Sequence, residues 1–311
     1  MAKQLLVVFG ATGNQGGSVA NAVFDNTELS QRYSVRAITR SIDNPKAQAL
    51  KSRGAELVAA DLDDPSSLPA ALKGADFVYA VTSTDYERGP RVTETRQAKA
   101  LVDEAVKQGV KYIIWSTLSS PAKISDGKLK NAEHFDVKAE IEDYIRGLPV
   151  KSAFFAPGSF MQNFFTNQMP RPSYTNDGSF MLANLLAPTT KVPLIDITNT
   201  GAWVAAILAE PEKYEGKVLA ASEGLYTMEE VVQIMSKVTG KTVTYSQLPD
   251  EMVKGFLPEP MKEQLFEMFL LQRDYGYFGK DTAEQVEWAK KQTIGKLNGV
   301  EEFLVKNGFK L

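Results

Sequence analysis

Short apolar runs alternate with amphipathic segments along the first half of the chain. Runs rich in β-branched and aromatic residues predict strands, and the segments between them have the apolar spacing of helices. The expected strands cover residues 4–10, 33–40, 55–62, 76–83, 111–120 and 150–160, and the expected helices cover residues 14–26, 44–54, 63–74, 92–109 and 132–150. Because this alternation is typical of a parallel sheet with crossover helices, we expect an α/β fold, with residues 1–156 forming a Rossmann-type doubly wound domain.

The alternation loosens after Pro157. Residues 178–197 predict a hairpin or an extended edge, and Thr227 with Glu230 forms a capping box at the start of a helix. Further helices are expected at 200–214, 227–240 and 260–279, and further strands at 216–224 and 241–249. We expect residues 157–311 to form a smaller C-terminal α/β lobe, with some of its strands and helices returning to the first domain.

Composition narrows the classes of function. The 311 residues include 35 Lys and Arg against 38 Asp and Glu, so a net charge of −3 gives no overall attraction to nucleic acid or to an anionic membrane. The absence of cysteine and a single histidine leave few ligands for zinc, so we expect no metal. The chain passes from Met1 directly into the first strand, and no apolar run approaches the ~20 residues of a membrane helix. We therefore expect a cytoplasmic protein, or alternatively a nuclear one, that contacts neither membrane nor nucleic acid directly.

Three glycines, Gly10, Gly13 and Gly16, are spaced as G-x-x-G-x-x-G between the first expected strand and the first expected helix. Glycine suits a turn this tight, and its missing β-carbon lets a pyrophosphate approach the helix N-terminus. In this context the spacing predicts a dinucleotide site. An ordinary glycine-rich turn is the alternative.

The ends of the next strands indicate which dinucleotide binds. Thr39 and Arg40 stand where an NAD site places an acidic residue, and Lys46 follows. Because a guanidinium pairs with a 2′-phosphate, we expect NADP(H), although a solvated Arg40 would also explain the residue. Asp61 is expected at the adenine ring, with helix capping as its alternative, and Thr82 at the end of the fourth strand is also expected to contact the cofactor.

The glycine turn, the basic strand end and the segment "HFDVKAEIEDYIR" at residues 134–146 resemble the NmrA-like family of atypical short-chain dehydrogenases/reductases. The segments "FFAPGSFMQNFF" and "VPLIDITNTGAWVAAIL" extend the likeness to about residue 210. Within this family the chain is most similar to the branch of NADPH-sensing regulators, and the isoflavone-reductase-like enzymes are more distant kin that keep the lysine. The resemblance implies contacts to the pyrophosphate by Thr12, Gly13, Asn14 and Gln15, to the 2′-phosphate by Arg40, to the nicotinamide ribose by Lys138, and to the nicotinamide end by Phe155, Ala156, Pro157 and Ser159.

His134 and Lys138 are the candidate catalytic residues. Typical short-chain dehydrogenases carry Tyr-x-x-x-Lys on one helix face, and His134 occupies the tyrosine position. An ammonium favours a phenolate, but it lowers the pKa of an imidazole from ~6.5 because it opposes a second positive charge. We therefore expect a neutral His134 at pH 7 that donates a hydrogen bond but rarely gives up a proton. The alternatives are a surface histidine, and a solvated Lys138 paired with Glu142.

Two functions follow from this site. The first is a redox-sensing regulator that binds NADP(H), has little or no dehydrogenase activity and contacts a protein partner through its C-terminal lobe. The alternative is an NADPH-dependent reductase of small apolar or phenolic compounds that uses Lys138. Hydroxyls after the fifth strand could orient a substrate or merely satisfy the loop; they belong to Ser116, Thr117, Ser119 and Ser120.

Overall fold

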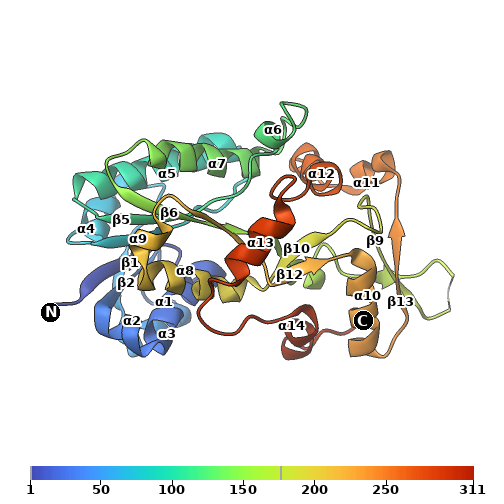
Figure 1. Ribbon diagram of the computed structural model, residues 1–311, viewed down its shortest axis with the longest axis horizontal. Helices are drawn as coiled ribbons and strands as arrows, with labels where there is room; N and C mark the ends of the chain where they lie inside the picture. The colour runs from blue at the N-terminus through green and yellow to red at the C-terminus, as the bar shows by residue number, and fades with distance from the viewer. Residues whose placement is uncertain (1, 176) are drawn as a thin grey trace.

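Seven parallel strands form the central sheet of the computed structural model, which describes residues 2–175 and 177–311 (Figure 1). Their order is β11-β6-β5-β4-β1-β2-β3. Strands β2 and β3 are added on one side of β1 and the later strands on the other side, so the strand order reverses between β1 and β4. This is a Rossmann-type topology, as predicted, and ligands of such sheets bind at the carboxyl ends of strands near the reversal. The strands are β1 (Gln4–Val8), β2 (Tyr33–Thr39), β3 (Glu56–Ala59), β4 (Phe77–Ala80), β5 (Tyr112–Ser116), β6 (Lys151–Pro157) and β11 (Val218–Ala221).

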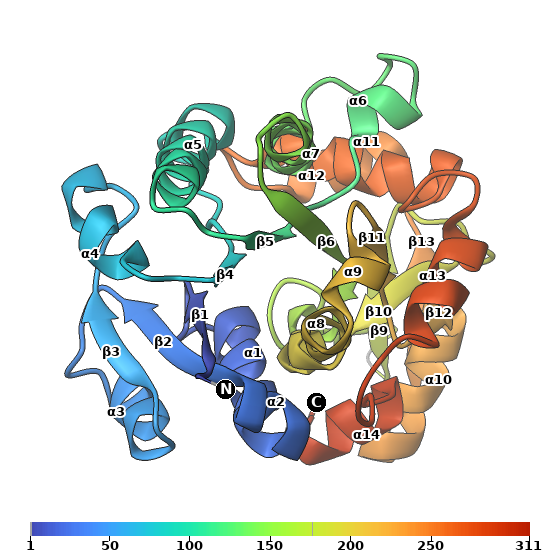
Figure 2. The same ribbon diagram turned by 60° about the vertical axis from the view of Figure 1, so that its left-hand side comes forward.

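Helices cover both faces of this sheet, which is why its central strands are apolar on both sides (Figure 2). Leu6 and Val8 of β1 belong to one core, whereas Val7 between them belongs to the other. The first core is closed by α1 (Asn14–Asp25), α2 (Thr27–Arg32), α3 (Pro45–Ser52) and α8 (Thr200–Ala209). The second is closed by α4 (Leu68–Leu72), α5 (Pro90–Lys107) and α7 (Glu133–Arg146).

Two elements of the second half of the chain belong to the central sheet and the helices that cover it. Strand β11 pairs with β6, and α8 packs against α1. A β-carbon on Gly201 of α8 would lie 2.4 Å from the carbonyl oxygen of Ser18 in α1, so only glycine permits this crossing. Helix α1, which follows the glycine turn and which we call the cofactor helix, is therefore in direct contact with a later part of the chain.

The C-terminal lobe contains two small sheets. One is ordered β12-β10-β7 and the other β13-β9-β8. The expectation of a hairpin or edge at residues 178–197 is wrong, because β9 and β10 are the central strands of different sheets. β9 pairs with the nearby β8 but also with the distant β13, and β10 pairs with β7 and β12, both distant in sequence, so a local pattern cannot reveal these sheets as a whole. The strands are β7 (Ser159–Phe160), β8 (Arg171–Pro172), β9 (Phe180–Asn184), β10 (Val192–Ile195), β12 (Gly224–Tyr226) and β13 (Val243–Gln247).

The remaining helices lie partly beside these sheets and partly against the central domain, where α9 contacts β6, α6 contacts α7 and α13 contacts β11. The capping box of Thr227 and Glu230 is confirmed at the start of α10. The helix expected at 260–279 is shorter, because α12 passes into a π-helical turn that ends at Gly276. No helix in the described residues is both long and apolar enough to cross a bilayer. These helices are α6 (Pro121–Ile124), α9 (Pro211–Tyr214), α10 (Met228–Thr239), α11 (Asp250–Phe256), α12 (Lys262–Leu270), α13 (Thr282–Lys290) and α14 (Val300–Lys306), with short 3-10 turns at Pro65–Ser67, Met161–Phe165 and Ile197–Asn199.

Candidate cofactor site and active centre

The glycine turn folds back on itself between β1 and α1. Gly10 has a φ of 62°, and its carbonyl accepts the Gly13 N–H at 2.9 Å. A β-carbon on Gly16 would lie 2.4 Å from the Gly10 oxygen. Gly10 and Gly16 are therefore required by the backbone of the turn itself, before any ligand is considered.

A cavity of about 530 Å³ opens beside this turn. Gly13 caps α1 without a side-chain hydrogen bond, which leaves the N-terminus of a 12-residue helix suited to an anion. The glycine turn lines one part of this cavity, which continues along α1 to Asp25, whereas Arg40, His134 and Lys138 do not line it. The wall includes Thr12, Gly13 and Asn14 of the turn, Lys46 of α3, and Lys296.

Gln15 points toward the sheet. Its Oε1 accepts hydrogen bonds from Tyr79 Oη and Ser116 Oγ, each at 2.8 Å. The Ser116 hydroxyl is thus used to hold the glycine turn against β4 and β5. The other hydroxyls after the fifth strand also make hydrogen bonds within the protein. Thr117 donates to the Lys138 carbonyl, Ser119 to the Tyr277 carbonyl and Ser120 to Asp136.

The ends of β2 and β3 place the residues expected at the adenosine. Arg40 is exposed directly after β2, and Thr39 Oγ1 accepts the Ser41 N–H at 3.3 Å. Asp61 accepts the N–H of Asp63 through one carboxylate oxygen at 2.9 Å. The capping alternative for Asp61 is wrong, because Asp64 caps the following 3-10 turn.

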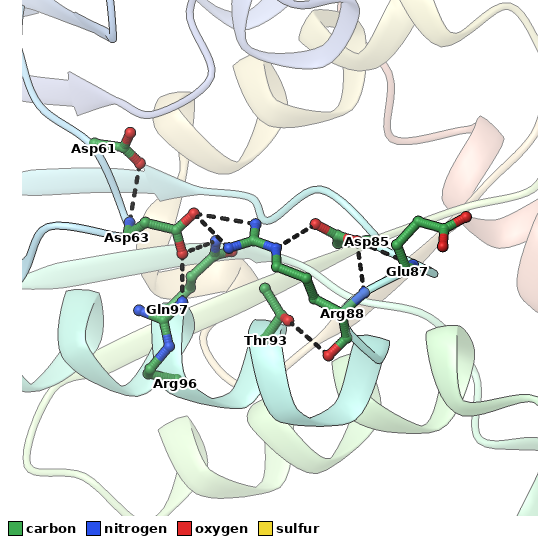
Figure 3. A network of polar contacts seen from close by, with 8 residues as sticks. All are labelled: Asp61, Asp63, Asp85, Glu87, Arg88, Thr93, Arg96 and Gln97. Carbon is green, nitrogen blue, oxygen red and sulfur yellow. Dashed lines mark hydrogen bonds and ion pairs between the residues drawn. The ribbon is translucent and has the colours of Figure 1, made fainter.

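A network of charged side chains lies next to these strand ends (Figure 3). Asp63 accepts hydrogen bonds from Gln97 at 2.9 Å, from Arg96, and from both terminal nitrogens of Arg88 at 3.1 Å. Arg88 also binds Asp85 through Nε at 2.6 Å. The hydrogen bonds from Gln97, Arg96 and Arg88 hold the pKa of Asp63 well below its usual range. The network joins the loops after β3 and β4 to α5.

Lys138 is buried and paired with a residue that the sequence did not suggest. Its Nζ lies 2.5 Å from Glu94 Oε2, and it donates to the carbonyl and hydroxyl oxygens of Thr82, each at 3.1 Å. Glu94 is 0% exposed and Lys138 is 8% exposed. The solvated alternative for Lys138 is wrong, since Glu142 binds Arg146 instead. Thr82, expected at the cofactor, holds this ion pair.

His134 is buried on the same face of α7, with 6% of its surface exposed. The alternative of a surface histidine is therefore wrong. Burial lowers its pKa to about 4, although the Gln264 hydrogen bond and the Glu94 charge act in the opposite direction. The expected lowering is confirmed, but the cause differs: the Lys138 charge contributes least, and Glu94 opposes it.

The residues expected at the nicotinamide end lie along β6 and β7. The Phe155 ring is fully buried against Trp203 of α8, with centroids 6.1 Å apart, so its side chain belongs to the core. Ala156 and Pro157 pair with Ala220 and Ala221 of β11, and Ser159 pairs with Leu194 of β10. The sheet thus brings this segment to the same edge as the glycine turn and Lys138.

Comparison with known proteins shows the family of the chain. The model of the NmrA-like family matches residues 2–304. The chain belongs to the NmrA-like family. It is 31% identical to an NmrA-like family domain-containing protein of Dictyostelium discoideum over 100% of both chains. It is 29% identical to the NmrA-like family domain-containing oxidoreductase FrzB of Cladobotryum sp, covering 94% of this chain and 93% of that protein.

Solved structures share the fold. The negative transcriptional regulator NmrA, in complex with NADP, matches with a TM-score of 0.80 and 21% identity, covering 98% of this chain and 95% of that chain. The same regulator has also been solved with NAD. At this identity the likeness concerns the fold alone.

The close approach at Gly16 gives a first prediction. Gly16→Ala should lower the free energy of unfolding by about 1–3 kcal/mol, because the added methyl group overpacks the turn against Gly10. Gly255→Ala is the control, since a β-carbon there meets no atom within 4 Å. Chemical denaturation measures both, and an unchanged stability in Gly16→Ala would contradict the account.

The buried ion pair gives a second prediction. Glu94→Gln should lower the free energy of unfolding by about 3–5 kcal/mol, because it leaves the Lys138 ammonium buried without a counter-charge. Adding Lys138→Met should restore much of this loss. The exposed Glu210, paired with Lys213, provides the control: Glu210→Gln should change stability by less than about 1 kcal/mol. Equal effects of Glu94→Gln and Glu210→Gln in denaturant melts would count against a buried pair.

Proposed function

We propose that this protein is an NADP(H)-binding, redox-sensing regulator with little or no dehydrogenase activity. The observation that carries the proposal is the state of the proton donors at the candidate active centre. The carboxylate of Glu94 offsets the positive charge of Lys138. Burial lowers the pKa of His134 to about 4, so its imidazole is uncharged at pH 7. The cofactor, when bound, supplies or accepts a hydride, but carbonyl reduction also needs an acid at the developing alkoxide.

Neither side chain serves well as that acid. A Tyr-x-x-x-Lys pair works because an unpaired ammonium makes the phenol more acidic. Here the ammonium lies 2.5 Å from a fully buried carboxylate, so its field on residue 134 is largely cancelled. A neutral imidazole whose pKa is lowered to about 4 has no readily released proton at pH 7.

Several features support cofactor binding. Thr12, Gly13 and Asn14 line a cavity at the N-terminus of α1, and this helix end favours an anion. Arg40 and Lys46 supply positive charge where the 2′-phosphate of NADP would be recognised. The structures of NmrA with NADP and with NAD add support from the family.

A chain of hydrogen bonds links the cofactor helix to the C-terminal lobe, as a sensor requires. Ser18 of α1 donates to the Thr198 carbonyl at 2.5 Å and accepts the Gly201 N–H at 2.8 Å. Two residues before Thr198, Asp196 accepts from Asn298 and Gln162, each at 2.7 Å. A shift of α1 upon cofactor binding would therefore reach the lobe through residues 196–201.

Binding and turnover measurements test this proposal together. Calorimetric titration should show NADPH binding, while a panel of aldehydes, ketones, quinones and enones should leave the NADPH absorbance unchanged. Steady NADPH oxidation that Lys138→Ala abolishes would contradict the regulator and favour the reductase. A lack of NADPH binding would contradict both.

Recognition of the 2′-phosphate is tested by charge reversal. Arg40→Glu should weaken NADPH binding by about tenfold or more and change NADH binding little, because only NADPH carries the phosphate that the carboxylate repels. Lys51→Glu, on the exposed surface of α3, is the control with the same change of charge. Equal losses for the two cofactors in Arg40→Glu would place the phosphate elsewhere.

A reductase of small apolar or phenolic compounds is the second candidate. The observation that favours it is that FrzB and other NmrA-like relatives are named oxidoreductases. Lys138 would then have to move a proton despite its contact with Glu94, and the substrate panel above distinguishes the two candidates.

A further inference from the structure

We propose that Gln264 fixes His134 as a hydrogen-bond acceptor, so that the candidate active centre takes a ligand hydroxyl at this point and disfavours a carbonyl oxygen. Gln264 is then a positioning residue that sets ligand specificity through His134. This rests on the proposed function in one respect: the ligand would bind at the candidate active centre, beside the bound cofactor.

The contacts of Gln264 assign the histidine tautomer. Gln264 Oε1 lies 3.2 Å from the backbone nitrogen of His134 and 3.2 Å from Nδ1 of its ring. A backbone N–H can only donate, so the amide atom that faces it is an oxygen, which can only accept. Nδ1 must therefore carry the ring proton, and the remaining nitrogen, Nε2, carries a lone pair.

Helix α12 holds Gln264 in this position. Glu267, one turn further along α12, accepts the backbone N–H and the side-chain amide of Asn131, each at 2.5 Å. Asn131 lies just before α7, so Gln264 and Glu267 of α12 both form hydrogen bonds at the start of the helix that carries His134. The acceptor oxygen is thus positioned from a distant part of the chain.

The groups that face His134 leave its ring neutral. Glu94 and Lys138 form an ion pair whose charges offset each other. The Tyr86 ring lies 5.6 Å from the imidazole, and burial raises the pKa of Tyr86 to about 12, so this phenol carries no charge at pH 7. Phe135, 4.9 Å away, adds an apolar wall. A neutral ring with one N–H has one donor, which Gln264 already occupies.

Nε2 has a free lone pair. It makes no hydrogen bond within residues 2–175 and 177–311. Nε2 is also not fully enclosed, because the side-chain polar atom that is both fully enclosed and without a partner in this part of the chain is Asp136 Oδ2. A hydroxyl can donate to this lone pair, whereas a carbonyl oxygen would face it with lone pairs of its own. A regulator could thus distinguish a hydroxyl compound from its carbonyl form.

The single histidine makes the tautomer directly measurable. In ¹⁵N-labelled protein at pH 7, long-range ¹H–¹⁵N NMR should find the ring proton on Nδ1 alone. In Gln264→Leu, Nδ1 loses its acceptor and the proton should redistribute between the two nitrogens. Gln264→Glu, which keeps an acceptor, should retain the proton on Nδ1. A ring proton on Nε2 in the unmodified protein would overturn the proposal, whether or not NADP⁺ binds.

Titrations with different ligands identify which hydroxyl binds Nε2. Phenol and anisole are matched probes, because only phenol has a donor. In the NADP⁺-saturated protein, phenol should shift the Nε2 resonance and bind about fivefold more tightly than anisole. If NADP⁺ alone shifts Nε2 and phenol adds nothing, a cofactor hydroxyl fills the acceptor. If neither shifts Nε2 while calorimetry shows that NADP⁺ binds, the proposal fails and the proposed cofactor site stands.

Discussion

The ion pair between Lys138 and Glu94 is the contact on which the rest of the candidate active centre depends. It connects α7 to α5 and is anchored to the end of β4 through Thr82. Because neither partner reaches water freely, each requires the other, and removal of one partner would leave an uncompensated charge in the interior. The same pairing offsets the positive charge of Lys138 near position 134, while burial keeps the imidazole of His134 neutral. Stability at this edge of the sheet therefore depends on the ion pair, and the protonation of His134 depends on its burial.

The function we propose rests on this charge balance and on the burial of His134. The NmrA-like fold serves proteins described as regulators and proteins described as oxidoreductases, so the fold alone does not decide the activity. In this chain the function we propose rests on His134, its partner Gln264, and Glu94. The contact of α1 with Gly201 gives the cofactor helix a second role, because any movement of α1 acts directly on the segment that leads to the C-terminal lobe.

Local patterns predicted much of the fold. The strands of the central sheet follow from apolar runs that are buried on both faces, and the glycine turn follows from a spacing whose need for unusual backbone angles is confirmed at Gly10, while Gly16 is required by its close approach to Gly10. The capping box at Thr227 is equally local. The two small sheets were not predicted, because β10, and β9 apart from its short pairing with β8, pair with strands distant in the sequence.

The site was predicted in part for the same reason. Lys138 and His134 share a helix face, so their proximity could be read from spacing. Glu94 lies 44 residues from Lys138, and Gln264 lies 130 residues from His134. In the sequence both look like ordinary polar residues of solvated helices. Only the packing of α5 and α12 against α7 brings them to the site, and it changes the expected hydrogen-bond donor at His134 into an acceptor.

The most direct test of the account is an NMR titration of His134, the single histidine, with and without saturating NADP⁺. Buried beside a neutralised lysine, the imidazole should remain uncharged down to a midpoint near pH 4. A midpoint at the ordinary value of ~6.5 or above would contradict the central claim, because His134 would then be available as an acid near neutral pH.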